Sequence, residues 1–387
     1  MVDLKAGLKA LAALSILSLT ACSSDVVIRE PAPEPEVVTT QEKVSIDTLW
    51  THSYSADEDL PTGVFRPAIV GQKVYVASNE GDVARIDAES GDEDWDLDLD
   101  TTLSAGIAAN EKGSVVVARS GDVVFISADG AELWRTDINR EVIQTPLLDD
   151  STVYLQTTNS NVIALDITSG AEKWVYSSRS PSLTLRGTGQ PVIYRNRLLV
   201  SLDSGNLIAL EKSSGQLLWE RRLQVPKGSN EFERIVDLDG RMTLSDNVLF
   251  VPGYQGNLSA VEAYTGQVLW QKEISSFMQP AYSVGRLYVA DSSSHLIMLD
   301  YRSGEVKWES KDFEYRELTS PEALGLYVLS TDMEGNVYVI DKSSADVVAK
   351  KGLGDAPITL VSNAEYAVAQ TANGKVRAFK LEVEKKD

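Results

Sequence analysis

The stretch DITSGAEKW, Asp166 to Trp174, decides the fold, because its pattern recurs along the chain. The pattern is an acidic residue, then a Ser or Thr followed by Gly, then a Trp eight residues after the acid. Glycine permits the positive φ of a hairpin turn, and the acidic side chain can accept hydrogen bonds from backbone N–H groups of that turn. Each copy therefore predicts a turn followed by a strand that carries Trp. The acid–Trp pairs are Asp87/Trp95, Asp166/Trp174, Glu211/Trp219, Glu262/Trp270 and Asp300/Trp308.

Two more strands precede each copy of the pattern. A stretch such as VYVAS (Val74–Ser78) alternates apolar and polar residues, and a second strand such as VIALD (Val162–Asp166) follows after a turn. From Trp95 onward, successive tryptophans are 39, 40, 45, 51 and 38 residues apart. Four short strands in roughly 40 residues are typical of a β-propeller blade. The sequence therefore predicts an all-β protein built from blades of four antiparallel strands.

Two further units lack the full pattern. The unit at 320–350 has Ala345 in place of Gly and Ala349 in place of Trp, and the unit at 356–380 stops after its third strand. The missing strand is predicted at the other end of the chain, where SIDTLW ends in the Leu-Trp pair found in three other units. We expect an eight-bladed β-propeller whose ring is closed by this N-terminal strand, which removes open sheet edges. Each of the seven tryptophans is then expected to dock against a neighbouring blade.

The N-terminus has the features of a secretory signal. Lys5 and Lys9 precede an apolar run over 10–21, which is too short to span a bilayer. Its end, LTAC (Leu19–Cys22), resembles the lipobox of bacterial lipoproteins, in which the Cys is lipidated; the alternative is an ordinary signal followed by a chance cysteine. Prolines alternate with acidic residues soon afterwards, which is typical of an extended tether. The predicted organisation is a signal peptide over 1–21, a lipidated Cys22 with a tether over 22–44, and the propeller over 45–387.

Composition excludes several classes of function. The net charge is −21, so an acidic surface would repel the phosphates of nucleic acid, and no nucleic-acid partner is expected. That charge either keeps the protein soluble or faces a basic patch on a partner. Cys22 is the single cysteine, which excludes disulfides and cysteine-based metal sites within the chain. The two histidines, His52 and His295, are far apart in sequence and suggest no metal site.

Two connectors between Trp-ended units are longer than the others. The one after Trp174 carries Leu183, Leu185 and Arg186, and the one after Trp219 carries Asp237 and Asp239. They follow consecutive blades, so they are expected on one rim of the ring. Two apolar anchors with a charged neighbour have the composition of a small interface hot spot, and the aspartates could orient the arginine or meet a basic partner. Alternatively, the leucines begin the next inner strand and face its core, and periodicity leaves both interpretations open.

The repeated pattern resembles the tryptophan-docking motif of the quinoprotein-like eight-bladed propellers. Together with the lipobox and the tether, the chain resembles the BamB family. That resemblance implies an outer-membrane lipoprotein of the β-barrel assembly machinery, lipid-anchored with its propeller in the periplasm, and Ser23 and Ser24 after the Cys imply sorting to the outer membrane. It also implies a non-catalytic scaffold that binds the POTRA domains of BamA beside the other subunits and assists insertion of nascent outer-membrane proteins. In the family the BamA-binding surface is associated with an LxLRG loop and a DxD connector, and both motifs match here, at 183–187 and 237–239.

An enzyme is the alternative interpretation, because quinoprotein dehydrogenases share the fold and hold a quinone and calcium in the central funnel. The chain lacks the adjacent cysteines that many of them use, and it contains no HExxH or GxSxG motif. The acidic run DLDLD (Asp96–Asp100) is expected on the solvent face of a strand rather than around calcium, which needs six or more converging oxygens. We therefore expect no catalytic residue, cofactor or metal. The alternative function is a periplasmic propeller that binds a small molecule or acts as a quinoprotein-like oxidoreductase.

Overall fold

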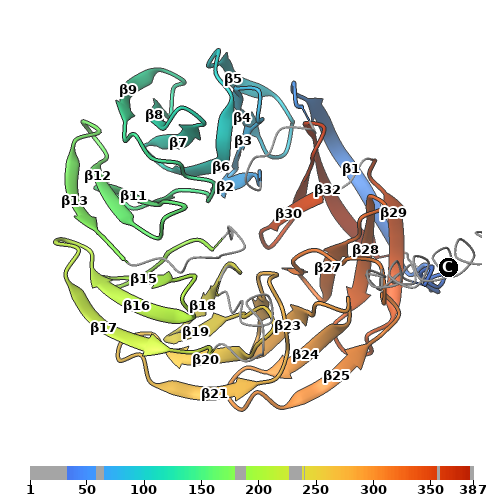
Figure 1. Cartoon of the computed structure of the whole chain (residues 1–387). Coiled ribbons are helices and arrows are strands. Elements are labelled where there is room, and N and C mark those ends of the chain that lie inside the picture. The colour runs from blue at the N-terminus through green and yellow to red at the C-terminus, as the bar shows by residue number, and fades with distance from the viewer. Residues whose placement is uncertain are drawn as a thin grey trace, which may run out of the picture. The chain divides into compact units, whose positions relative to one another are not determined.

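Strands are the regular elements throughout the computed structural model, which describes residues 33–57, 65–178, 189–225, 238, 240–354 and 358–383. In these ranges the strands form eight four-stranded sheets, each antiparallel, which stand as blades around a central axis (Figure 1). Pro35–Asp387 forms one compact unit. Within the described ranges, no helix is long and apolar enough to cross a membrane. The predicted fold, an eight-bladed propeller with four antiparallel strands per blade, is confirmed.

Each of seven blades consists of four consecutive strands, and the strands of a blade are numbered from the central axis outward. Blade 1 is β2(Ala68–Val70), β3(Lys73–Ala77), β4(Asp82–Asp87) and β5(Glu93–Asp98); blade 2 is β6(Leu103–Asn110), β7(Gly113–Ala118), β8(Asp122–Ser127) and β9(Glu132–Asp137); blade 3 is β10(Leu147–Leu148), β11(Thr152–Gln156), β12(Val162–Asp166) and β13(Glu172–Tyr176); blade 4 is β14(Val192–Tyr194), β15(Arg197–Ser201), β16(Asn206–Glu211) and β17(Leu217–Arg222).

The remaining blades continue around the ring. Blade 5 is β18(Thr243–Ser245), β19(Val248–Val251), β20(Leu258–Glu262) and β21(Val268–Lys272); blade 6 is β22(Ala281–Ser283), β23(Arg286–Ala290), β24(Leu296–Asp300) and β25(Val306–Ser310); blade 7 is β26(Glu322–Leu324), β27(Tyr327–Thr331), β28(Asn336–Asp341) and β29(Val347–Gly352); blade 8 is β30(Ile358–Ser362), β31(Ala367–Thr371), β32(Lys375–Val383) and β1(Val44–Ser53). The second and third strands are almost wholly buried, and the outer strands are partly exposed, as the repeat predicts.

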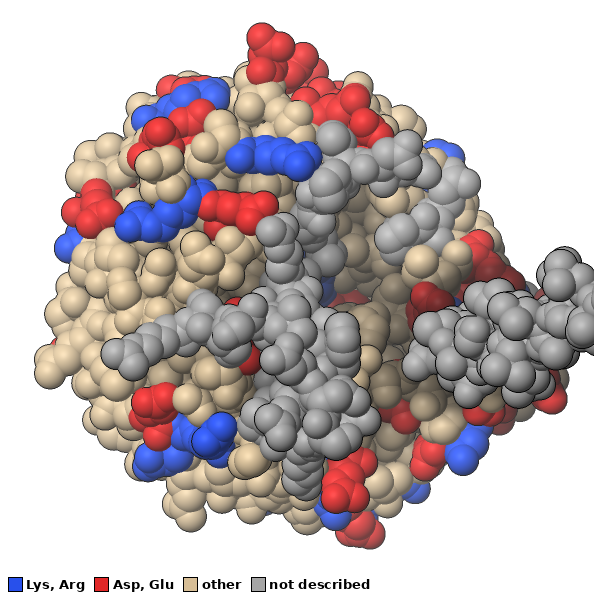
Figure 2. All heavy atoms as spheres, in the orientation of Figure 1, with Lys and Arg blue, Asp and Glu red and all other residues tan. Residues whose placement is uncertain are grey.

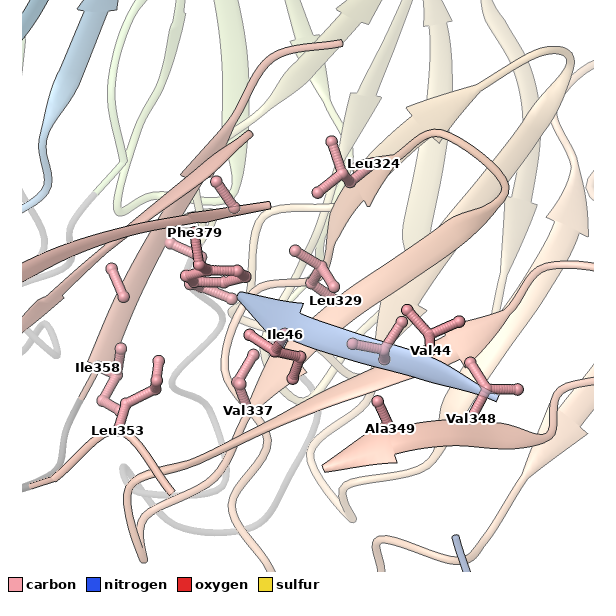
Figure 3. Packing of buried hydrophobic residues seen from close by; sticks show 14 residues of the cluster. Val44, Ile46, Leu324, Leu329, Val337, Val348, Ala349, Leu353, Ile358 and Phe379 are labelled. Carbon is pink, nitrogen blue, oxygen red and sulfur yellow. The ribbon is translucent and has the colours of Figure 1, made fainter. Parts of the chain in front are cut away.

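The N-terminal strand closes the ring. β1 pairs with β32 from Val44 opposite Val383 to Ser53 opposite Lys375, with a bulge next to Trp50. Figure 3 shows β1 lying along β29, with Val44 close to Val348 on the neighbouring blade. These apolar side chains share one buried cluster, so the two ends of the chain are joined by both backbone pairing and core packing. The prediction of closure by the N-terminal strand is confirmed.

Each tryptophan docks against the next blade, as predicted. Its indole N–H donates to a backbone carbonyl in the turn between the third and fourth strands of that blade, at 2.8–3.1 Å in all seven cases. In six of the seven receiving turns a glycine lies against the indole, and in the turn of blade 7 Ala345 stands at that position. A Cβ at Gly170 would stand 2.6 Å from Cε3 of Trp134, so only glycine allows the indole to approach this closely.

The acidic residue of the pattern accepts hydrogen bonds within the turn. Oδ1 of Asp166 accepts the N–H groups of Thr168 and Ser169 at 3.0 and 3.1 Å, together with both hydroxyl groups. These bonds, first of all the one from the Thr168 hydroxyl, lower the pKa of Asp166. In blade 1 the N–H of Ser90 and the ammonium of Lys73 lower the pKa of Asp87 to about 2. The carboxylates are therefore ionised when they accept these hydrogen bonds and stabilise the turns.

The structure explains why blade 7 lacks the tryptophan. The outer strand of blade 8 comes from the N-terminus, so blade 8 has no turn between its third and fourth strands to receive an indole. At the corresponding position Ala349, with Val348, packs into the cluster of Val44 and Ile46 (Figure 3). The ammonium of Lys351 donates to the Ile46 carbonyl at 2.7 Å. The exception to the sequence pattern thus marks the place where the ring closes.

Residues before β1 also contact the propeller. Val38 is buried in the cluster of blades 6 and 7. The N–H groups of Gln41 and Lys43 donate to the carbonyls of Val347 and Val348 at 2.8 Å each. Arg316 donates to the carbonyl of Glu36. Sequence analysis assigned residues 22–44 to the tether; in the structure the part from 36 onward lies against blades 6 and 7.

Candidate interaction surface

One face of the ring carries every connector that runs from an outer strand to the inner strand of the next blade. Because the strands of a blade alternate in direction, the turns between second and third strands lie on the same face. We call this the connector face. Around blades 3 to 5 its described residues are 157–161, 177–178, 189–191, 202–205, 223–225, 238, 240–242, 252–257 and 273–280.

The residues that sequence analysis singled out lie outside the described ranges: Cys22, Leu183, Leu185, Arg186, Asp237 and Asp239. The structure does describe the ends of both long connectors. The first leaves β13 of blade 3 and enters β14, and the second leaves β17 of blade 4 and enters β18. Both therefore start and end on the connector face, with blade 4 between them. Both interpretations of Leu183 and Leu185, as core residues or as partner contacts, concern residues outside the described ranges.

The second long connector begins at a fixed point. The N–H groups of Leu223 and Gln224 donate to the Gly205 carbonyl at 2.9 and 3.1 Å. The side-chain amide of Gln224 donates to the Asn257 carbonyl at 2.7 Å, and its Oε1 accepts the Asn257 N–H at 3.2 Å. Because Gly205 belongs to blade 4 and Asn257 to blade 5, this start is held by two blades at once.

The same connector returns to the ring through buried residues. Leu238, which stands between the two aspartates of the DxD motif, is fully buried in a cluster with Leu223, Met242 and Leu249. A Cβ at Gly240 would stand 2.5 Å from Cγ of Pro252, so the chain passes close over blade 5. Burial of a leucine side chain contributes roughly 1.5–3 kcal/mol. The stretch around Leu238 is therefore held in place by the core of blades 4 and 5.

The first long connector also ends at a fixed point, and blades 3 and 4 are held together beside it. The side-chain amide of Gln190 donates to the Pro146 carbonyl at 2.8 Å. Gln156 donates to the Ser201 carbonyl at 2.9 Å from one blade to the next. The hydroxyl of Ser160 donates to Asp203 at 3.0 Å and links two turns of the connector face. Blades 3 to 5, joined by these hydrogen bonds, thus form a platform that holds the described ends of both connectors.

Sequence analysis missed an exposed aromatic residue beside this platform. Phe277 is 47% exposed and stacks edge-on with Tyr254, with ring centroids 6.1 Å apart. Its carbonyl oxygen would be 3.0 Å from a Cβ at Gly240, so it lies next to the returning end of the second connector. Val225, at the start of that connector, is also exposed. An aromatic residue inside a short connector, ISSFMQ, is the signal that could have revealed it.

A polar network crosses the axis of the ring and was also missed. Arg66, before blade 1, donates to Gln279 at 2.6 Å, to the Leu360 carbonyl at 2.8 Å and to the carboxylate of Glu322. It thereby joins blade 1 to blades 6, 7 and 8. Burial raises the pKa of Glu322, and the charge of Arg66 opposes that rise. Several units begin with a polar residue and Pro, as in Arg66-Pro67, and this repeated pair is the signal for the network.

On the face seen in Figure 2, the charged groups of the described residues do not collect into a single patch. Figure 2 shows acidic and basic side chains interspersed around the rim, with a wide uncharged area on the left over blades 3 and 4. Asp96 and Asp98 are exposed on β5 and alternate with the partly buried Leu97, as expected for the solvent face of a strand. In the part of the chain that the structure describes, no group of three or more His, Cys, Asp or Glu residues is placed to hold a metal ion.

Comparison with known proteins identifies the family. A family model described as outer membrane protein assembly factor BamB matches residues 79–310. BamB of Yersinia pestis is 30% identical, covering 96% of this chain and 97% of that protein. BamB of Pseudomonas aeruginosa is 34% identical, covering 87% of this chain and 88% of that protein.

Solved structures confirm the fold. The crystal structure of BamB from Moraxella catarrhalis has a TM-score of 0.79 at 23% identity and covers 87% of this chain and 100% of that one. A quinohemoprotein alcohol dehydrogenase from Comamonas testosteroni has a TM-score of 0.68 at 12% identity, covering 89% of this chain and 78% of that one, which shows a shared fold alone. On the strength of the family model and of relatives that match along nearly the whole chain, this protein belongs to the BamB family of outer membrane protein assembly factors.

Proposed function

We propose that this protein is a non-catalytic scaffold lipoprotein of the β-barrel assembly machinery, which assists the assembly and insertion of β-barrel proteins into the outer membrane. The observation that carries the proposal is similarity along nearly the whole chain to proteins named outer membrane protein assembly factors. The same relatives are named assembly factors rather than dehydrogenases, which supports a role without catalysis. A shared propeller fold does not favour an oxidoreductase, because one fold hosts many functions.

The partner of the connector face is proposed to be the POTRA region of BamA. Leu183, Leu185 and Arg186 on the first long connector, with Asp237 and Asp239 on the second, are the proposed contact residues. The platform of blades 3 to 5 supports this assignment, because its hydrogen bonds hold the described ends of both connectors. A binding site held by a rigid scaffold loses less conformational entropy on association than a free loop would. The exposed ring of Phe277 adds an aromatic anchor of the kind enriched at interfaces.

The anchor is proposed to be a lipid on Cys22, with the propeller in the periplasm. The lipobox-like LTAC sequence supports the lipid. The contacts of residues 36–43 with blades 6 and 7 shorten the part of the tether that can extend freely. From Cys22 to Pro35 an extended chain reaches roughly 45 Å. That span sets how far from the membrane surface the propeller could work.

Co-purification from membranes tests the proposal. A tagged full-length chain is solubilised, and the recovered proteins are compared with those recovered by a variant carrying Leu185→Glu and Arg186→Glu. We expect the first to recover a large outer-membrane barrel protein with POTRA domains and the second to lose it while keeping the same thermal unfolding midpoint. Matched controls are Leu218→Glu on the partly exposed outer strand of blade 4 and Arg195→Glu on the opposite face. Equal recovery by the folded double variant contradicts the proposed contacts, and unfolding of that variant shows that the leucines are core residues.

A further inference from the structure

A cavity on the axis of the ring has a mixed lining. Its volume is about 360 Å³. One part of the wall is apolar. It is formed by Ile69, Ile107 and Leu147, which lie on the innermost strands of blades 1, 2 and 3. The other part carries the guanidinium groups of Arg66 and Arg241 and the carboxylate of Glu322. An apolar wall opposite a few convergent polar groups is the usual composition of a small-molecule site.

The charges that line this cavity do not cancel. Arg66 donates to three acceptors, one of them the Glu322 carboxylate, and the Ser362 hydroxyl donates to the same carboxylate at 3.1 Å. Arg241 donates to the Thr145 hydroxyl, and among the described residues no carboxylate forms an ion pair with it. Among the described residues that line the cavity, two guanidinium groups and one carboxylate therefore leave one positive charge.

A partly buried cation without an ion-pair partner among the described residues is costly, because it loses part of its hydration and the nearby Glu322 carboxylate compensates for that loss only in part. Burial and the charge of Arg66 lower the pKa of Arg241 to about 9, far below the usual range of arginine. The chain as a whole carries a net charge of −21, so its long-range field repels anions. A positive site inside such a protein is a local feature that selects an anion by direct contact.

We infer that the axial cavity binds a small organic monocarboxylate, with its carboxylate on Arg241 and its apolar body against Ile69, Ile107 and Leu147. A single negative charge matches the single uncompensated guanidinium, and a guanidinium can donate two parallel hydrogen bonds to a carboxylate. A phosphate dianion would bring more negative charge than the one uncompensated guanidinium can balance, and Glu322 would repel the excess. The apolar wall distinguishes an organic acid from an inorganic anion. This binding function goes beyond the scaffold role, because its ligand is a small molecule held on the axis of the ring, where Arg241 forms the returning end of the second long connector.

Calorimetric titration with benzoate tests the inference on the full-length protein. Benzamide, which has the same ring without the charge, and inorganic phosphate, which has charge without the ring, are the matched probes. We expect benzoate to bind at a single saturable site and to raise the unfolding midpoint with concentration, and neither other probe to do so. Arg241→Gln is expected to weaken benzoate at least tenfold. Arg135→Gln on the outer strand of blade 2 is expected to leave it unchanged.

A second variant keeps the test decisive if Arg241→Gln fails to fold. Ala109→Leu narrows the cavity from its wall while leaving Arg241 in place, and it is expected to block benzoate. Absence of saturable binding to the wild-type chain overturns the inference, as does undiminished binding to folded Arg241→Gln or Ala109→Leu. Binding of phosphate in place of benzoate overturns the organic class of ligand.

Discussion

The indole N–H of Trp134 donates to the carbonyl of Ile167 at 2.8 Å and so fastens the outer strand of blade 2 to the turn of blade 3. The same bond recurs from blade to blade around the ring, and the receiving turn contains glycine in six of the seven cases and Ala345 in blade 7. Blade 7 itself carries no tryptophan, because its neighbour has no such turn. One local sequence pattern therefore sets both the contact between blades and the place of ring closure.

Gly170→Ala tests the close approach in the blade 3 turn. The new Cβ would stand 2.4 Å from Oγ1 of Thr136 and 2.6 Å from Cε3 of Trp134, at a φ of +70°. The left-handed conformation costs about 1–2 kcal/mol, and the overpacking adds about 1–3 kcal/mol. Urea unfolding should show that the free energy of unfolding falls by about the sum of these two contributions. Gly325→Ala is the control, because its φ is +56° and its Cβ would meet no atom within 4 Å. Equal losses in the two variants would contradict the proposed role of the contact.

Ala349→Trp tests the explanation for the missing tryptophan. A Trp at this position meets the packed cluster of Val44 and Ile46 instead of a receiving turn, so it should destabilise the protein by about 1–3 kcal/mol. Denaturant unfolding measures the loss, and the emission of the added indole reports its exposure to water. A stabilised variant with a buried indole would show that blade 8 can receive a tryptophan after all.

Acid should weaken the turns in a predictable range of pH. The pKa of Asp87 in the folded protein is about 2, below its ordinary value of 3.8, so its contribution to stability is present above pH 4. That contribution is lost as the pH falls through about 2. Asp87→Asn keeps an acceptor oxygen but does not titrate, so its unfolding midpoint should fall less steeply between pH 4 and pH 2. The exposed Asp129→Asn is the control. Identical slopes for wild type and Asp87→Asn would refute the assignment.

Val38→Asp tests whether the segment before β1 is held on the propeller. Val38 is 6% exposed in the cluster of blades 6 and 7, whereas its neighbour Val37 is 91% exposed. A carboxylate at 38 should detach the segment and speed protease cleavage within residues 36–43, because a cleavable chain must leave the surface. Val37→Asp should cleave at the wild-type rate. Cleavage that is equally fast in both variants would show that burial of Val38 does not hold the segment.

The fold could be predicted from the sequence because the deciding signal is local and repeated. The acidic residue of each pattern forms hydrogen bonds within its own turn, and the tryptophan contacts the turn of the next blade. These two kinds of contact recur from unit to unit. The N-terminal strand could be placed because its Leu-Trp pair copies the other outer strands. Ala349 shows the limit: its meaning depends on the absent turn of blade 8, which no local pattern reveals.

The interaction surface could be predicted only in part. The long connectors stand out by their length, and both leave and enter the ring beside blade 4. The network of Arg66, Gln279 and Glu322 was missed, because residues more than 200 positions apart meet there only through closure of the ring. The repeated pair of a polar residue and Pro marks the start of several units, but it does not show which of these residues meet in the ring.

Calorimetric titration of the full-length protein with the purified POTRA domains of BamA tests the central claim most directly. The wild-type chain should bind at one saturable site. A variant with Asp237→Lys and Asp239→Lys should bind at least tenfold more weakly with an unchanged unfolding midpoint, since truncating or reversing a charge at an interface costs several kcal/mol. Binding of undiminished affinity by that folded variant, or no binding by the wild-type chain, would contradict the claim that the connectors after blades 3 and 4 carry the partner site.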